Sequence, residues 1–197
     1  MKFLPYVVIL ALLTLPTVTE AKSSVSNERS YALAVEEKKV KLSKLLNAVS
    51  KKTSKQFMVH ANSRSEVVAY GIEEENVNYN ELLSIIDLNG MAAVEIEGIV
   101  NILPVSLVKQ YPVPQISAGD KLEHGNLWVT KIIDTGSLSA GEVLPLLRSL
   151  VRVDGHMASH GRSHSIILVA PYNSVVRVEN IIRELDQANS KATNKAS

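Results

Sequence analysis

The sequence has 197 residues with a formal net charge of +1, which comes from 21 Lys and Arg against 20 Asp and Glu. Without a basic excess or a basic run, nucleic acid and anionic membrane surfaces are not expected as partners. The absence of cysteine excludes disulfides, thiolate metal ligands, a thiol nucleophile and a lipid-anchored cysteine. Stability must therefore come from packing alone.

The N-terminus carries the pattern of an export signal. Lys2 precedes the apolar run FLPYVVILALLTLP, and Ala21 stands just before the composition becomes polar. The run has about 14 residues, which is shorter than the ~20 that a transmembrane helix needs. We therefore expect a cleavable signal peptide at 1–21, cleavage before Lys22, a short extension at 22–29 and an exported mature chain.

The region 30–106 alternates strand and helix signals, as a small α/β domain does. Its apolar spacing changes between a period of two and a period of 3.6 residues, and Asn89 and Gly90 end its second helix. The expected elements are a strand at 31–35, a helix with a stripe of Leu42, Leu45, Leu46 and Val49, strands at 56–60 and 67–71, a helix with a capping box of Asn78 and Glu81, and a hairpin at 92–103.

The region 107–125 contains prolines and glycines without an apolar period, which predicts an interdomain linker. The region 126–187 is then a second small domain, and the tail 188–197 is expected to be disordered because it has no apolar residue larger than Ala. The expected elements of the second domain are a strand at 127–133, a helix behind a capping box of Ser139 and Glu142, a hairpin of GHMAS and SIILVAP, and a helix capped by Asn173 or Ser174. In each domain two helices would cover one face of the sheet, and the other face would be open to water or a partner.

Several of these segments resemble the periplasmic N-domains of secretins, the outer-membrane channels of the GspD and PilQ type. KLSKLLNAVSKKTSKQFMV and NYNELLSIIDLNGMAAVEIEGIVNILP are similar to the first N-domain, and VTKIIDTGSLSAGEVLPLLRSLV with NIIRELD is similar to the second. The resemblance covers about residues 30–187. The helix, the NG pair and the hairpin of the first domain also occur in the signalling domain of TonB-dependent receptors.

The resemblance implies an α+β fold of two small domains in tandem, the first like a secretin or TonB-receptor signalling domain and the second of the K-homology type. In secretins such domains stack into rings, and the first domain meets an inner-membrane assembly-platform protein through paired strand edges. That implies a partner-binding edge strand at Tyr31, Ala32, Leu33, Ala34 and Val35. The alternative is an ordinary strand edge without a partner.

A secretin continues into further N-domains and a channel-forming domain, whereas this sequence stops at Ser197. We therefore expect a scaffold or adaptor of a secretion system, or a truncated secretin. The expected partners are secretin subunits, the inner-membrane assembly-platform protein, or further copies of the chain in a ring. Nucleic acid and small-molecule substrates are not expected.

The sequence carries no motif of an enzyme, because it lacks G-x-S-x-G and a phosphate-binding glycine loop, and no cofactor is expected. The stretch GHMASHGRSH at 155–164 spaces three histidines by four residues. The hairpin sets His156 back in a strand and leaves His160 and His164 at the tip, as metal ligands or as polar tip residues. A periplasmic metal-binding protein and a TonB-receptor-like signalling domain are thus the alternative functions.

Overall fold

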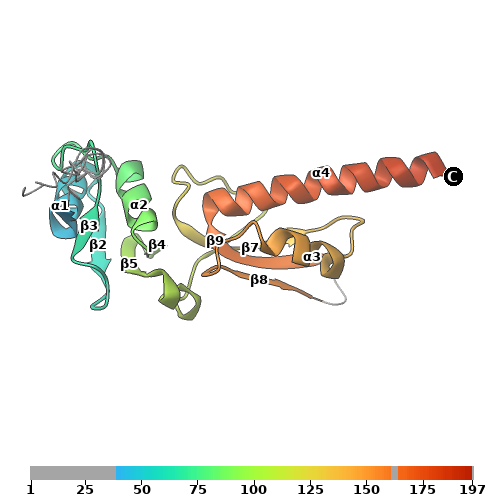
Figure 1. The fold of residues 1–197 in the computed structure, drawn as a ribbon, viewed down its shortest axis with the longest axis horizontal. Coiled ribbons are helices and arrows are strands. Elements are labelled where there is room, and N and C mark those ends of the chain that lie inside the picture. The colour runs from blue at the N-terminus through green and yellow to red at the C-terminus, as the bar shows by residue number, and fades with distance from the viewer. Residues whose placement is uncertain (1–38, 161–163, 197) are drawn as a thin grey trace, which may run out of the picture. The chain divides into compact units, whose positions relative to one another are not determined.

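The computed structural model describes residues 39–160 and 164–196, which are drawn as the coloured ribbon in Figure 1. The predicted signal peptide, the extension at 22–29 and the strand at 31–35 lie outside the described residues. The expected α+β class is confirmed. The division into two domains stays a prediction, so the two stretches are called here the N-terminal half (39–104) and the C-terminal half (105–196).

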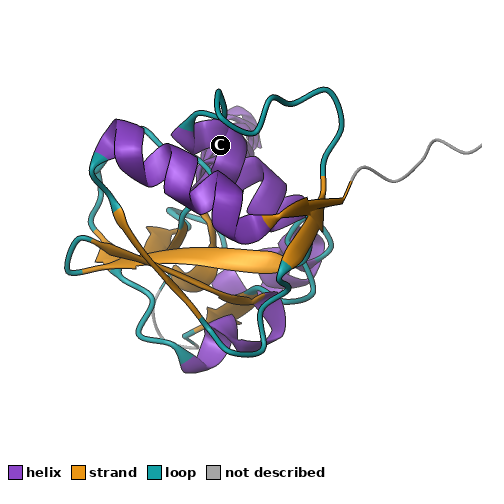
Figure 2. Cartoon of the chain, turned by 90° about the vertical axis from the view of Figure 1, so that its left-hand side faces the viewer, coloured by secondary structure: helices purple, strands orange, loops and turns teal. Residues whose placement is uncertain are grey.

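The N-terminal half holds two helices and two small sheets (Figure 2). One sheet is the antiparallel pair β1 and β3, and the other has the order β2-β5-β4, with β2 parallel and β4 antiparallel to β5. The elements in chain order are β1 (Lys39–Lys41), α1 (Leu42–Thr53), β2 (Gln56–Val59), β3 (Glu66–Val68), α2 (Tyr79–Leu88), β4 (Met91–Ile96) and β5 (Ile99–Pro104).

Local sequence signals account for most of this half. The buried residues of α1 are the predicted stripe of Leu42, Leu45, Leu46 and Val49. Before α2, the Glu81 N–H donates to Asn78 Oδ1 and the Asn78 N–H donates to Glu81 Oε2, both at 2.9 Å. The predicted capping box is therefore confirmed, and it satisfies two N–H groups that the first turn of a helix leaves without partners.

The C-terminal half is built on a four-stranded sheet of order β6-β7-β9-β8. Figure 1 shows α4 lying along this sheet and continuing beyond it. The elements are η1 (Val105–Gln110), β6 (Gln115–Ile116), β7 (Trp128–Asp134), α3 (Ala140–Arg148), β8 (His156–Ser159), β9 (Ser165–Pro171) and α4 (Tyr172–Ala196). The predicted linker at 107–125 thus contains most of η1 and all of β6.

One face of the β2-β5-β4 sheet, the one that α1 and α2 do not cover, differs from the expectation. We expected it to be open, but β4 is buried on both sides over its first four residues. Ala92 and Val94 of β4 pack with Leu103, Val108 and Trp128 in a single apolar cluster. Val108 comes from the segment expected to be a linker, so the connection itself covers this face.

The starts of the last two helices also differ from the prediction. Ser139 precedes α3, but its side chain makes no capping hydrogen bond. Its carbonyl instead accepts from the N–H groups of Glu142 and Val143, at 3.1 and 3.2 Å. The predicted capping box of Ser139 and Glu142 is therefore wrong, because a tight first turn closed by backbone groups replaces it.

Helix α4 begins at Tyr172 rather than after a cap at Asn173 or Ser174. The N–H groups of Tyr172 and Asn173 donate to the carbonyls of Leu127 and Gly125, at 2.9 and 2.8 Å. A distant loop thus supplies the acceptors that a capping side chain would supply. The sequence around 173 holds no signal for this contact.

The expectation of a disordered tail at 188–197 is wrong for its helical part, because α4 continues to Ala196. The segment has no Gly or Pro to end the helix. Asp186 accepts hydrogen bonds from the N–H and the hydroxyl of Ser137, at 2.7 and 2.6 Å, and Asn189 Nδ2 donates to Ser137 Oγ at 3.1 Å. These bonds hold the helix beside the loop that precedes α3, although side chains 187–192 are exposed.

A buried charge ties α4 to the sheet. Lys131 lies on β7 between Val129 and Ile133, on the face that packs against α3 and α4, and only 4% of its side chain is exposed. Its ammonium lies 2.6 Å from Glu179 Oε2 on α4. Because a buried ammonium is strongly destabilising without a counter-charge, this pair makes the position of α4 on the sheet specific.

We expect Glu179→Ala to lower the free energy of unfolding by roughly 1–3 kcal/mol, because it leaves the Lys131 ammonium buried and unpaired. The loss is smaller than for a fully enclosed pair, since 36% of the Glu179 side chain is exposed. Adding Lys131→Met should recover most of the loss. Urea unfolding followed by far-UV circular dichroism measures both effects, with Arg177→Ala, an exposed residue of α4, as the control. Equal midpoints for Glu179→Ala and the wild type would show that the pair contributes nothing.

Candidate interaction surfaces

The three histidines of the stretch 155–164 are in different surroundings. His156 is exposed on β8, opposite Val169. His160 and His164 stand on either side of residues 161–163, which lie outside the described ranges. The ring of His164 lies against the loop before α3, where its Nδ1 is 2.9 Å from the Leu138 carbonyl oxygen. Because a carbonyl only accepts, His164 Nδ1 carries the hydrogen in this bond.

This contact engages one of the two imidazole nitrogens of His164 with the backbone. Within the described residues, no group of three His, Asp or Glu side chains is placed to hold a metal ion. A metal site formed by His160 and His164 stays a prediction. Sequence reasoning missed the contact with Leu138, because the two residues are 26 positions apart.

Strand edges provide a second kind of surface. Among the described strands, nothing pairs with the outer side of β2 or of β8, whereas β4 forms a parallel bridge through Ala93 to Leu127. Met58 and Val59 on β2 have 57% and 46% of their surface exposed. An exposed edge with apolar side chains can pair with a strand of another protein.

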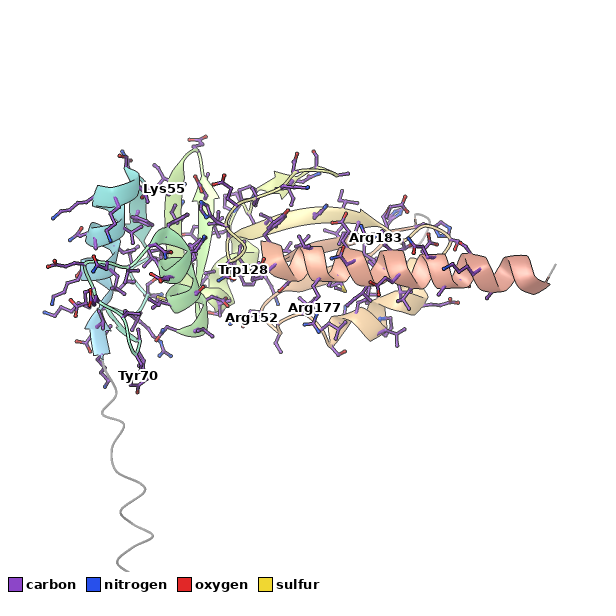
Figure 3. All side chains as sticks on the ribbon, turned by 90° about the horizontal axis from the view of Figure 1, so that it is seen from above. Lys55, Tyr70, Trp128, Arg152, Arg177 and Arg183 are labelled. Carbon is purple, nitrogen blue, oxygen red and sulfur yellow. The ribbon has the colours of Figure 1, made fainter. Side chains whose placement is uncertain are left out.

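A third surface lies where the two halves meet. Arg152 follows α3 and its Nη1 lies 2.8 Å from Asp87 Oδ1 at the end of α2. The next residue in each segment is a highly exposed apolar one, Leu88 at 85% and Val153 at 94%. We call Asp87, Leu88, Arg152 and Val153 the junction surface; Arg152 is labelled in Figure 3.

Burial raises the pKa of Asp87, and the charge and hydrogen bond of Arg152 oppose that rise only in part. The carboxylate is thus partly withdrawn from water while it remains paired. The two residues are 65 positions apart, so no local pattern could have revealed the pair.

The cluster that contains Trp128 is apolar. Trp128 is 1% exposed at the start of β7 and belongs to the cluster that covers β4 (Figure 3). Its indole N–H has no hydrogen-bond partner among the described residues. The indole therefore contributes through packing, and its polar atom opposes burial.

Comparisons with known proteins define the class to which this fold corresponds. The sequence matches no family model. It is 28% identical over 155 residues to the secretin GspD of Vibrio cholerae, and the aligned region covers 76% of this chain and 23% of that protein. It is 24% identical over 166 residues to the secretin XcpQ of Pseudomonas aeruginosa, and the aligned region covers 83% of this chain and 24% of that protein.

A solved structure agrees with these relatives. The fold matches a chain of the Klebsiella pneumoniae type II secretion system outer membrane complex, of PulD, PulS and the PulC HR domain, with a TM-score of 0.61 at 22% identity. The match covers 78% of this chain and 26% of the other. This chain therefore shares its fold with part of that complex, and its resemblance to secretins is confirmed.

The chain spans about a quarter of the length of the curated relatives that it matches. Across residues 39–160 and 164–196, none of the helices has the length and apolar character that crossing a membrane would require.

We expect Asp87→Asn to change how stability depends on pH. Because burial raises the pKa of Asp87, the folded chain holds the proton more tightly than the unfolded chain does. The contribution of Asp87 to the free energy of unfolding is therefore complete when the pH is below the ordinary pKa of 3.8. It falls as the pH rises through the raised pKa.

The free energy of unfolding of the wild type, minus that of Asp87→Asn, should thus decrease as the pH rises from the ordinary value of 3.8 through the raised pKa of Asp87. Urea unfolding measured by the emission of Trp128, the single tryptophan, provides both values at each pH. Glu75→Gln, at an exposed carboxylate, is the matched control. A difference that increases with pH would show that the attraction of Arg152 exceeds the effect of burial.

Proposed function

We propose that this chain is a non-enzymatic periplasmic scaffold or adaptor that acts through protein–protein contacts in type II protein secretion. The observation that carries the proposal is similarity to secretins across 76% to 83% of the chain. The match to a secretion-system outer membrane complex supports it. The exposed edges and apolar surfaces described above are also the features that a binding module uses.

The proposed partners are secretin subunits, an inner-membrane assembly-platform protein, or further copies of this chain in a ring. The matched Klebsiella structure contains a PulC HR domain together with PulD, which supports a partner of that kind. We propose residues 31–35 as the edge strand that pairs with this partner. Two domains at 30–106 and 126–187, with 107–125 between them, would then each present one binding surface.

The adaptor role is tested by recovery of partners from cells. The full chain, with an affinity tag at its C-terminus, is expressed in a bacterium that has a type II secretion system and is purified after mild crosslinking. A secretin or an inner-membrane component should be recovered in amounts that track the tagged protein. Recovery of neither, with the tagged chain present in the periplasm, would overturn the adaptor role.

The edge strand is tested by Leu33→Pro, because proline removes the backbone N–H and is poorly tolerated in a paired strand. We expect at least about a tenfold lower recovery of the inner-membrane partner, with an unchanged thermal midpoint. Ser24→Pro, in the predicted extension, is the matched control and should have no effect. Unchanged recovery with Leu33→Pro would overturn the assignment of the edge and leave the adaptor role intact.

A further inference from the structure

Two neighbouring hollows lie at the start of β8. The first, of about 370 Å³, is lined in part by Lys109, Arg148 and Arg152. The second, of about 460 Å³, is lined in part by Val113 and Val169. Lys109 and His156 line both hollows, so the two adjoin. We call them together the β8 groove.

The groove is cationic without compensation from its own walls. No Asp or Glu lines either hollow. Lys109 Nζ donates to the Val153 carbonyl at 3.3 Å, and Arg148 Nη2 donates to the Met157 carbonyl at 3.1 Å. Among the described residues neither cation forms an ion pair, whereas Arg152 is paired with Asp87. Two full positive charges thus face the groove with only neutral acceptors.

The other end of the groove continues onto an apolar surface. Val169 and Ile167 lie two positions apart on β9, so they are on the same face of the sheet. Ile132 on β7 is paired directly with Ile167. These two isoleucines are 50% and 40% exposed, and they lie on the face opposite the one that α3 and α4 cover.

We propose that the β8 groove binds an extended segment of a partner protein in which a run of acidic residues adjoins a run of apolar ones. The carboxylates would pair with Lys109 and Arg148, and the apolar side chains would lie over Val169 and Ile167. Charge complementarity favours this occupant, because the groove offers cations and no anion. An inorganic anion would use only the cationic end. Such binding goes beyond the proposed function and does not require a secretin partner.

Arginine and lysine contribute differently to such a site. The planar guanidinium of Arg148 can donate two parallel hydrogen bonds to one carboxylate, whereas the ammonium of Lys109 acts as a point charge. Both side chains are exposed, so salt will screen their attraction. Binding should therefore weaken as ionic strength rises.

The test uses the full chain and a fluorescein-labelled peptide, Glu-Asp-Glu-Val-Ile-Val, in an anisotropy titration at low salt. The control peptide, Gln-Asn-Gln-Val-Ile-Val, differs only in its charges. The acidic peptide should bind at least about fivefold more tightly than the neutral one. The double variant Lys109→Gln with Arg148→Gln should remove that difference, and Ile167→Ser should weaken binding of both peptides.

A matched control removes two other charges. Arg177→Gln with Arg183→Gln changes exposed cations on α4 that do not line the groove, so net charge falls equally (Figure 3). This variant should bind the acidic peptide as the wild type does, and thermal melts should show that all variants fold. Equal binding of the two peptides, or equal losses in the two double variants, would overturn the proposal. Sedimentation in which only the groove variant loses self-association would also overturn it, by assigning the groove to a second copy of the chain.

Discussion

The burial of Trp128 is the interaction on which the described structure depends. Its side chain is 1% exposed and packs against Ala92 and Val94 of β4 and against Leu103 and Val108. Together with Val108, the indole covers the face of the β2-β5-β4 sheet that carries Ala92 and Val94. In a chain without disulfides, such apolar contact is the main source of order between distant segments.

The residues around Trp128 connect this packing to the second sheet. Leu127 bridges to Ala93 of β4, and its carbonyl accepts the N–H of Tyr172 at the start of α4. Strand β7, which begins at Trp128, places Lys131 under α4, against Glu179. A single strand, β7, therefore determines both the covering of the first sheet and the position of the longest helix.

The same packing leaves other surfaces uncovered. The outer edge of β2, the junction surface and the β8 groove all carry exposed apolar side chains, and the groove adds Lys109 and Arg148, which form no ion pair among the described residues. Apolar side chains exposed together in this way are typical of surfaces that contact other proteins. Similarity to secretins gives a biological context for such contacts.

The sequence by itself determined the local structure: the stripe of α1, the capping box of Asn78 and Glu81, the hairpin of β4 and β5, and the α+β class. These signals act between residues a few positions apart, so periodicity and capping reveal them. Only the tertiary structure decided where α4 begins, how β4 is covered, and which cations are paired. Those outcomes depend on groups that are distant in the chain, such as Lys131 with Glu179, 48 positions apart, and Arg152 with Asp87, 65 apart. Their energy comes from burial and pairing, which no local pattern records.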